Sequence, residues 1–350
     1  MSHWTTFLLA HGASFDADAV SAFGDAPGER LAARDAAVVC PLGPLGALSV
    51  SGPDAASFLQ GQLTNDVTAL APGSGQLSAW CSPKGRVLAN FILRCIAPDH
   101  FELLLPRLLL DSVQRRLAMF VLRAKVTLGD ASEAAIRIGV GGPAAAARIA
   151  ELAGAAPALL RWTAIEGGSV AALPGSRFIA SVDPVAAPGL WDRLAGVARP
   201  AGFPCWRWLT VRAGVPVILP PTQDQFIPQM LNLDVLGGIG FHKGCYVGQE
   251  IVARTQYLGR LKERLSLAHA ASAPAPGTRL YATAFGDQAC GTVINAVAAP
   301  GGGADVLCVA QLAASAAGEL RADAADGAAL ALLPLPYAVP LPAEPPGRSA

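Results

Sequence analysis

Apolar and polar positions alternate over short stretches in the first half of the chain, and this period-two pattern predicts β-strands. The turn-forming residues at 82–85 and 97–99 separate three of these stretches. The predicted strands are residues 45–50, 76–81, 85–95, 101–105 and 125–128.

Two segments between these strands have helical spacing instead. Pro53 and Asp54 precede residues 55–60 and are typical of a helix start, and Gly61 is expected to end that helix. Residues 108–122 carry an acidic residue early and arginines late, as the helix dipole favours. Strand, helix and strand in this order predict an α+β unit with an antiparallel sheet.

The segment 131–200 has a similar order of elements. Strands are predicted at 136–140 and 178–182, and helices at 143–153 and 188–198. The repetition predicts a duplicated, ferredoxin-like layout.

After residue 277 the pattern becomes all-β, with short apolar runs interrupted by glycines, which predicts a small barrel or sandwich. An Ala/Ser/Pro-rich linker is expected at 267–276. The predicted organisation is an α+β region of two intertwined subdomains at 1–266, a β-barrel at 267–338 and a Pro-rich, extended or disordered tail at 339–350.

Composition narrows the function classes. The 350 residues include 26 basic and 26 acidic side chains, which disfavours a nucleic-acid binder that depends on overall charge. No apolar run reaches the roughly 18 residues of a membrane span, and a basic signal-peptide region is missing, so we expect a cytoplasmic protein without membrane contact. Seven scattered cysteines without a CxxC pair argue against disulfides, and His242 with Cys245 alone would not make a metal site.

The densest group of functional residue types is the sequence KGCYVGQE at residues 243–250. The residues after Cys245 have helical spacing, with Glu250 and Arg254 as an i,i+4 pair. Cys245 is therefore expected at a helix N-terminus, where backbone N–H groups and Lys243 favour the thiolate and lower the pKa of the thiol. The alternative is a structural cysteine buried in the loop before the helix.

Other residues allow two interpretations each. Trp206 and Trp208, before the strand-like residues 209–211, are either packing residues or a surface on which a planar heterocycle stacks. Asn65 belongs either to a turn or to a polar set that faces a ligand. Arg254 is part of a basic cluster that is either a solvated helix face or a pocket for a carboxylate or phosphate tail.

Three segments together resemble one family. They are GPDAASFLQGQLTNDV at 52–67, VRAGVPVI at 211–218, and the stretch from QFIPQMLNLD to FHKGCYVGQEIVAR within 225–254. KGCYVGQE matches in full the signature that distinguishes the YgfZ group of folate-binding proteins from their relatives, the glycine-cleavage aminomethyltransferases (T-proteins). The resemblance covers roughly residues 40–265.

The resemblance implies a three-subdomain, aminomethyltransferase-like folate-binding fold, α+β with a small C-terminal β-barrel, around a central hole for the pterin of tetrahydrofolate. It also implies a role in assembling or repairing iron–sulfur clusters in client enzymes, including tRNA-modifying ones. The expected functional residues are Lys243 and Cys245, with Gly244, Tyr246, Gly248, Gln249 and Glu250 completing the motif. The expected cofactor contacts are Trp206, Arg212, Asp224, Asn65 and Arg254.

Two departures from the relatives bear on activity. Aminomethyltransferases carry an acidic pair that acts at the folate nitrogen, where this chain has Ala89 and Asn90, so aminomethyl transfer is not expected. Relatives often carry a Glu that hydrogen-bonds the pterin edge, where Arg212 offers donors only, and Asp224 is the alternative acceptor. Two other functions stay open: a tetrahydrofolate-dependent one-carbon transferase, and a non-catalytic folate-sensing scaffold in which Cys245 only packs.

Overall fold

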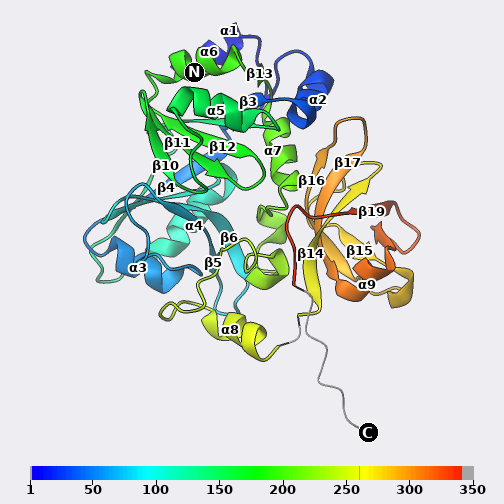
Figure 1. Cartoon of the computed structure of the whole chain (residues 1–350). Coiled ribbons are helices and arrows are strands. Elements are labelled where there is room, and N and C mark those ends of the chain that lie inside the picture. Colours follow the sequence, from blue (N-terminus) through cyan, green and yellow to red (C-terminus); the bar gives the residue numbers. More distant parts are fainter. Residues whose placement is uncertain (1, 260, 341–350) are drawn as a thin grey trace.

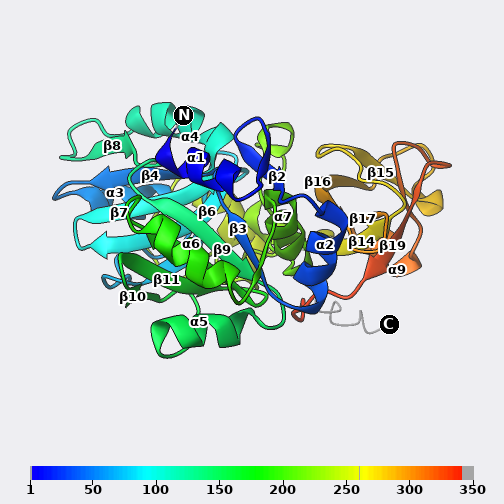
Figure 2. The ribbon, with the colours of Figure 1, turned by 90° about the horizontal axis from the view of Figure 1, so that it is seen from above.

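Two stacked sheets and a closed barrel dominate the structure (Figure 1). The computed structural model describes residues 2–259 and 261–340. Helices cover the outer faces of the sheets, and the barrel lies beside them, as the view from above also shows (Figure 2). None of the described helices is long and apolar enough to cross a membrane. The predicted α+β class and the C-terminal barrel are confirmed.

The first sheet has the strand order β5-β6-β7-β4-β8, and all neighbours are antiparallel. Its strands are β4 (Leu45–Ser51), β5 (Gly75–Cys81), β6 (Val87–Ala97), β7 (His100–Pro106) and β8 (Thr127–Asp130), so every strand predicted here is present. Two helices, α3 (Ala55–Gln62) and α4 (Arg107–Ala118), pack on it. α4 buries Leu109, Val113 and Leu117 in the same core cluster as Leu48 and Val50 of β4, because residues four apart lie on one helix face.

The boundaries of these two helices differ from the predicted ones. α3 continues through Gly61 to Gln62, because burial of Phe58 and Leu59 outweighs the roughly 1 kcal/mol that a glycine costs inside a helix. α4 ends at Ala118, four residues early, and Leu122 beyond it is exposed, so no core contact extends the helix.

The second sheet has the order β10-β11-β12-β9-β3-β13. Its strands are β3 (Val38–Pro41), β9 (Ile136–Gly141), β10 (Trp162–Ile165), β11 (Gly168–Leu173), β12 (Arg177–Val182) and β13 (Arg199–Pro200), with α5 (Ala145–Ala153) and α6 (Ala187–Ala195) outside. In the first sheet β8 pairs with β4. In the second sheet β3 takes the corresponding position and pairs with β9. Because β3 comes from earlier in the chain, the two sheets are intertwined.

The N-terminal segment completes the second sheet's outer layer. It consists of α1 (His3–Ala10), the β1–β2 hairpin (Ser14–Asp16 and Ala19–Ala22) and α2 (Ala26–Asp35). Trp4 of α1 meets Trp191 of α6 edge to face, with ring centroids 5.8 Å apart. This contact fixes α1 on α6.

The central helix α7 (Phe203–Arg212) lies between the second sheet and the barrel (Figure 1). The strand predicted at 209–211 is wrong, since these residues form the last turn of α7. Trp206, Trp208, Leu209 and Val211 are all buried, so the apolar residues of this helix lie close together in the sequence and resemble a buried strand.

The barrel closes in the order β14-β17-β16-β15-β18-β19, because β14 pairs with both β17 and β19. Its strands are β14 (Glu263–Ala270), β15 (Arg279–Tyr281), β16 (Gly291–Ala298), β17 (Ala304–Gln311), β18 (Leu320–Ala322) and β19 (Ala329–Leu333), with α9 (Leu312–Ala317) between β17 and β18. β14 takes up part of the segment 267–276 that was expected to be a linker. The domain boundary at 266–267 stays a prediction.

After the barrel the chain returns to the centre of the molecule. Leu335 packs against the main core cluster, and the Tyr337 hydroxyl donates a hydrogen bond to the carbonyl oxygen of Gly214 (2.7 Å). Residues 341–350 of the predicted Pro-rich tail lie outside the described part of the chain.

Candidate functional site

The segment that carries KGCYVGQE joins the short helix η2 (Pro228–Leu231) to α8 (Gln249–Tyr257). Cys245 was expected at the start of the helix. α8 begins at Gln249, with Gly248 as its N-cap in the left-handed conformation, so Cys245 precedes the first helical residue by four positions (249 − 245). The predicted helix-start thiol is therefore wrong, because the left-handed Gly248 stops the helix from extending back to Cys245.

Hydrogen bonds tie this segment to the loop between α3 and β5. Asn65 Nδ2 donates to the carbonyl oxygens of Leu77 (2.9 Å) and Gly237 (2.7 Å), and Thr64 Oγ1 donates to the Gly238 carbonyl (2.7 Å). The Gly240 N–H donates back to the Thr64 carbonyl (2.9 Å). The segments 52–67 and 225–254, which were found separately in the sequence, thus form one structural unit. In this unit the Asn65 amide group donates its hydrogen bonds to backbone carbonyls.

The Lys243 ammonium crosses to the C-terminal end of α3. Its Nζ donates to the carbonyl oxygens of Gln60 (2.7 Å), Leu63 (2.5 Å) and Asn65 (3.0 Å). Carbonyls at a helix C-terminus lack partners within the helix and attract positive charge. Burial lowers the pKa of Lys243 to about 8, and the nearby Asp66 carboxylate opposes this shift.

All three N–H groups of that ammonium are therefore engaged by backbone. The hypothesis that Lys243 holds the Cys245 thiolate is not supported by this geometry. The side chain instead fixes the loop to α3.

The other end of the loop is fixed by two glycines in close contact. Gly248 and Gly85, in the β5–β6 turn, both have positive φ (+81° and +67°), and a Cβ on Gly248 would lie 2.8 Å from the Gly85 Cα. Tyr246 is buried between these anchors, and burial raises the pKa of its hydroxyl. Tyr246 and Gly248 thus have structural roles, whereas Gly244 and Cys245 between the anchors are exposed.

Cys245 differs from every other cysteine of the chain. All seven cysteines lie in the described residues, and Cys245 is the exposed one. Burial raises the pKa of the other thiols, for example to about 12 for Cys205. Cys245 is therefore the thiol that a partner molecule can reach.

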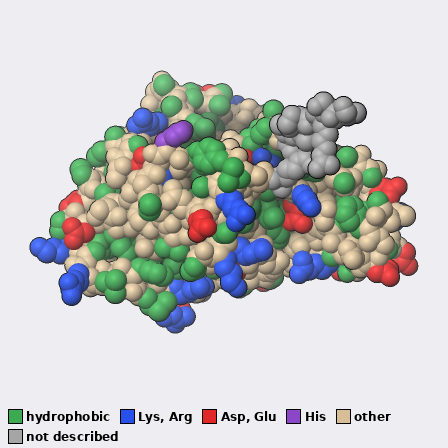
Figure 3. All heavy atoms as spheres, turned by 90° about the horizontal axis from the view of Figure 1, so that it is seen from below, with side chains coloured by type: hydrophobic (Ala, Val, Ile, Leu, Met, Phe, Trp, Pro, Cys, Tyr) green, Lys and Arg blue, Asp and Glu red, His purple; other side chains and the backbone are tan. Residues whose placement is uncertain are grey.

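The loop of residues 243–248, here called the cysteine loop, leads directly into α8, whose surface lies beside it. Ile251, Tyr257 and Leu258 are exposed, and Lys and Arg side chains lie among hydrophobic ones on this face of the molecule (Figure 3). The expected Glu250–Arg254 ion pair is not among the salt bridges of the described residues; both side chains are exposed to solvent, where such a pair gains little.

A cavity of about 390 Å³ lies where the two sheets, α7 and the barrel meet. Its wall is mostly apolar, with Phe91 and Ile92 from β6, Leu104 from β7 and Val297 from β16. None of the residues 243–250 lines it. The cysteine loop and the cavity are thus two separate sites.

The cavity contains a buried cation beside an aromatic ring. The Arg177 guanidinium lies over the Trp206 ring, 5.3 Å from its centroid, and both residues line the cavity. Arg177 Nε donates to the Pro174 carbonyl (2.9 Å) and Nη1 to Thr210 Oγ1 (2.8 Å). Burial lowers the pKa of Arg177 to about 9.

Two asparagines hold residues 216–218 along another side of the cavity. Asn90 of β6 donates from Nδ2 to the Pro216 carbonyl (2.7 Å) and accepts at Oδ1 from the Ile218 N–H (2.9 Å). Asn295 of β16 makes the equivalent pair of bonds with the backbone of Val217 (both 2.8 Å). A carboxylate at position 90 could accept but not donate, so this clamp requires an amide.

Of the expected cofactor contacts, Trp206 lines the cavity. Arg212 ends α7 and points to the barrel, where Nη1 lies 3.7 Å from Asp305 Oδ2. Asp224 is exposed and accepts a hydrogen bond from Ser82 Oγ (2.7 Å). Asn65, Arg212, Asp224 and Arg254 do not line this cavity.

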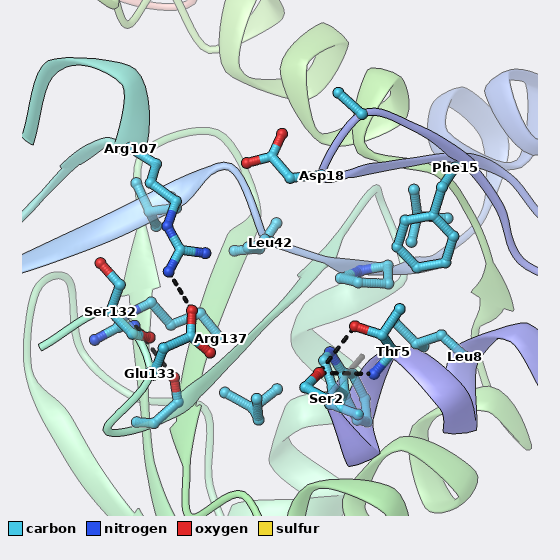
Figure 4. Close-up of a pocket in the computed structure, with 18 residues that line it drawn as sticks. Ser2, Thr5, Leu8, Phe15, Asp18, Leu42, Arg107, Ser132, Glu133 and Arg137 are labelled. Atoms are coloured by element: carbon cyan, nitrogen blue, oxygen red, sulfur yellow. Dashed lines mark hydrogen bonds and ion pairs between the residues drawn. The ribbon is translucent and has the colours of Figure 1, made fainter.

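A smaller cavity of about 340 Å³ adjoins the first, and both include Asp18 and Leu45 in their walls. Figure 4 shows Arg107 paired with Glu133 at its edge, and Ser2 bonded to Thr5 across from them. Because its polar side chains largely pair with each other, we assign this cavity no ligand.

Sequence reasoning missed Arg177. It is the one charged residue in the apolar run GSVAALPGSRFIASV at 168–182, which is a signal that could have been noticed. No such signal marks Asn295, because its hydrogen-bond partner, the backbone of Val217, lies 78 residues away in the sequence.

Comparison with known proteins fits this architecture. The model of the GCVT N-terminal domain matches residues 11–177. The tRNA-modifying protein YgfZ of Yersinia pseudotuberculosis is 33% identical over 300 residues, which cover 83% of this chain and 90% of that protein. The chain belongs to the YgfZ family.

One further relative and one solved structure are also similar to this chain. The tRNA-modifying protein YgfZ of Cronobacter sakazakii is 35% identical over 234 residues, 65% of this chain and 70% of that protein. The crystal structure of glycine cleavage system aminomethyltransferase T from Bartonella henselae superposes with a TM-score of 0.77 over 95% of this chain and 96% of that one, at 18% identity. This YgfZ-family chain therefore has the aminomethyltransferase-like fold that its sequence predicted.

Proposed function

We propose that this protein is a cytoplasmic, tetrahydrofolate-binding factor that supports assembly or repair of iron–sulfur clusters in client enzymes, among them tRNA-modifying ones. In this proposal Cys245 is the functional thiol. The observation that carries it is the cavity beside Trp206 and Arg177, in a fold shared with an aminomethyltransferase. The name of the relatives, tRNA-modifying protein, supports the choice of clients.

The cavity suits a folate head group. Its volume of about 390 Å³ lies in the range of small-molecule sites, and an apolar wall with few polar groups is typical of them. Trp206 lines the cavity and offers the edge of its indole ring to a planar heterocycle. Arg177 offers N–H donors to its polar edge.

The cavity does not suit aminomethyl transfer. Asn90 stands where the resemblance to aminomethyltransferases implies a carboxylate, and its amide is bonded to backbone. Asp18 is the one carboxylate among the lining residues in the described part of the chain, and it is exposed at the rim. A general base in contact with the bound ligand is therefore missing from this wall, which disfavours the one-carbon transferase.

Cys245 faces solvent on the separate cysteine loop, so its thiol is available to another protein rather than to a ligand in the cavity. A cluster needs several thiolate ligands, and one accessible thiol supplies a single one. We therefore propose that Cys245 acts together with groups of the client. The exposed side chains of α8 offer a surface on which a client can dock, and no direct contact with nucleic acid is proposed.

The folate half of the proposal is tested by calorimetric titration with tetrahydrofolate. We expect saturable binding by wild type and roughly 3–10-fold weaker binding by Trp206→Phe, because the smaller ring loses part of the aromatic contact. Trp208→Phe is the matched control on the same helix: it loses a hydrogen bond to Asp305 (2.8 Å) and does not line the cavity, so its Kd is expected to stay within about twofold of wild type. Wild type that takes up no folate would refute the cofactor assignment.

The thiol half is tested in cells that lack their own copy. Complementation with Cys245→Ala is expected to lower an iron–sulfur-dependent tRNA modification to the level of the empty vector, measured by mass spectrometry of nucleosides. Cys290→Ala, a buried cysteine of the barrel, is the control and should complement. Full complementation by Cys245→Ala would instead favour the folate-sensing scaffold.

A further inference from the structure

Arg177 is a buried cation without a counter-ion. It begins β12 and is only 3% exposed, yet none of the salt bridges within residues 2–259 and 261–340 involves it. Its two hydrogen bonds go to uncharged oxygens, those of Pro174 and Thr210. Burying a charge without a partner is costly, so such a residue indicates a group that the free protein lacks.

The unused donors of Arg177 face the cavity. A guanidinium has five N–H groups, and the protein occupies one on Nε and one on Nη1. Nη2 has no hydrogen-bond partner among the described residues, and it is not among the polar atoms that protein seals off. Since Arg177 lines the cavity, Nη2 is open to a ligand there.

The rest of the polar wall is poor in free acceptors. The Asn90 and Asn295 side chains are engaged by residues 216–218. Thr210 Oγ1 accepts from Arg177 and donates to the Trp206 carbonyl (2.8 Å). Asp18 and Arg207 also line the cavity, but both are exposed at its rim, and Arg207 Nη2 donates to the Ala296 carbonyl oxygen (3.3 Å). The interior thus offers donors, and it favours a ligand edge that carries acceptors.

The ring of Trp206 is covered by protein groups. Its face is covered by the guanidinium, and a Cβ on Gly139 would lie 2.6 Å from Trp206 Cε3, so the ring is held between β9 and Arg177. A flat heterocycle in the cavity can therefore meet Trp206 at the edge of the indole ring, beside the Arg177 guanidinium.

We propose that Arg177 determines specificity by donating hydrogen bonds to the oxo-bearing edge of a pteridine, so that the cavity accepts 4-oxopteridines and rejects 4-aminopteridines. The inference deepens the proposed folate function and rests on it. A 4-amino group would place N–H donors against the donors of Arg177, leaving both unsatisfied in a dry site.

The test compares two probes that differ at this edge, folic acid (4-oxo) and aminopterin (4-amino), which carry the same tail. Wild type is expected to bind folic acid at least about 30-fold more tightly than aminopterin, and the ratio should fall below about threefold in Arg177→Met. Because each ratio is measured within one variant, a general loss of affinity cancels. Arg94→Met is the matched control and should keep the wild-type ratio, because the Arg94 guanidinium lies over another tryptophan, Trp162 (4.1 Å to the ring centroid), and does not line the cavity.

Arg177→Lys is a second variant, which keeps the test decisive if Arg177→Met fails to fold. It keeps the cation but loses the fork of donors, so we expect an intermediate ratio. A wild-type ratio near one, or a wild-type ratio retained in Arg177→Met or Arg177→Lys, would overturn the inference while folate binding itself stands. If wild type binds neither probe nor tetrahydrofolate, the proposed function fails instead.

Discussion

Replacing Lys243 with Met is expected to lower the free energy of unfolding by about 2–4 kcal/mol, measured by urea denaturation. The Nζ group is the partner of three backbone carbonyls at the end of α3, and Met leaves them without a donor. Each buried carbonyl left unpaired costs roughly 1–3 kcal/mol, and relief of the buried charge offsets part of the sum.

The matched control is Lys84→Met. Lys84 is exposed in the β5–β6 turn, and its replacement is expected to change the free energy of unfolding by less than about 0.5 kcal/mol. Equal effects of the two substitutions would show that Lys243 does not anchor the loop.

Lys243 also gives the stability a pH dependence with a defined sign. Its pKa is about 8 in the folded protein and about 10.4 in an unfolded chain. Between these values the unfolded chain binds more protons, so the contribution of Lys243 to stability rises with pH and is lost again as the pH falls through 8. The difference in unfolding free energy between wild type and Lys243→Met should increase from pH 8 to pH 10.

Replacing Gly248 with Ala is expected to cost about 3 kcal/mol of unfolding free energy, for two reasons that add. The residue has φ of +81°, and its Cβ would lie 2.5 Å from the Ser82 carbonyl oxygen and 2.8 Å from the Gly85 Cα. Both contacts are with backbone, which cannot rotate away, so the start of α8 would have to move off the β5–β6 turn.

Gly244→Ala is the control within the same motif. A Cβ there meets nothing within 4 Å, and its φ lies outside the left-handed region. The change is expected to alter the unfolding free energy by less than about 1 kcal/mol. If Gly248→Ala were as mild as Gly244→Ala, the contact between the two glycines would not hold the loop.

Variants at the anchor residues of the motif differ in meaning from variants at Cys245. Loss of function in Lys243 or Gly248 variants would follow from loss of the loop's conformation, since both residues act as anchors. Cys245 is exposed between the anchors, and its side chain can be changed without breaking either one. Cys245 variants are therefore the ones that report on chemistry.

The sequence determined the strands of the first sheet and the C-terminal barrel. Strand patterns such as that of β6 are local, because alternate side chains point to opposite faces. Three segments of the sequence, one of them containing KGCYVGQE, together identified the family, and the relatives confirm it.

Only the tertiary structure decided what the motif residues do. Lys243 bonds to Leu63, 180 residues away, and Gly248 meets Gly85 in the β5–β6 turn of the first sheet. Arg177 and Trp206 meet at the cavity because α7 packs on β3 and β9 of the sheet to which β12 belongs. Neighbouring residues set the backbone pattern, but the partner of a polar group is set by which distant segments fold beside it, and no local period of the sequence records that.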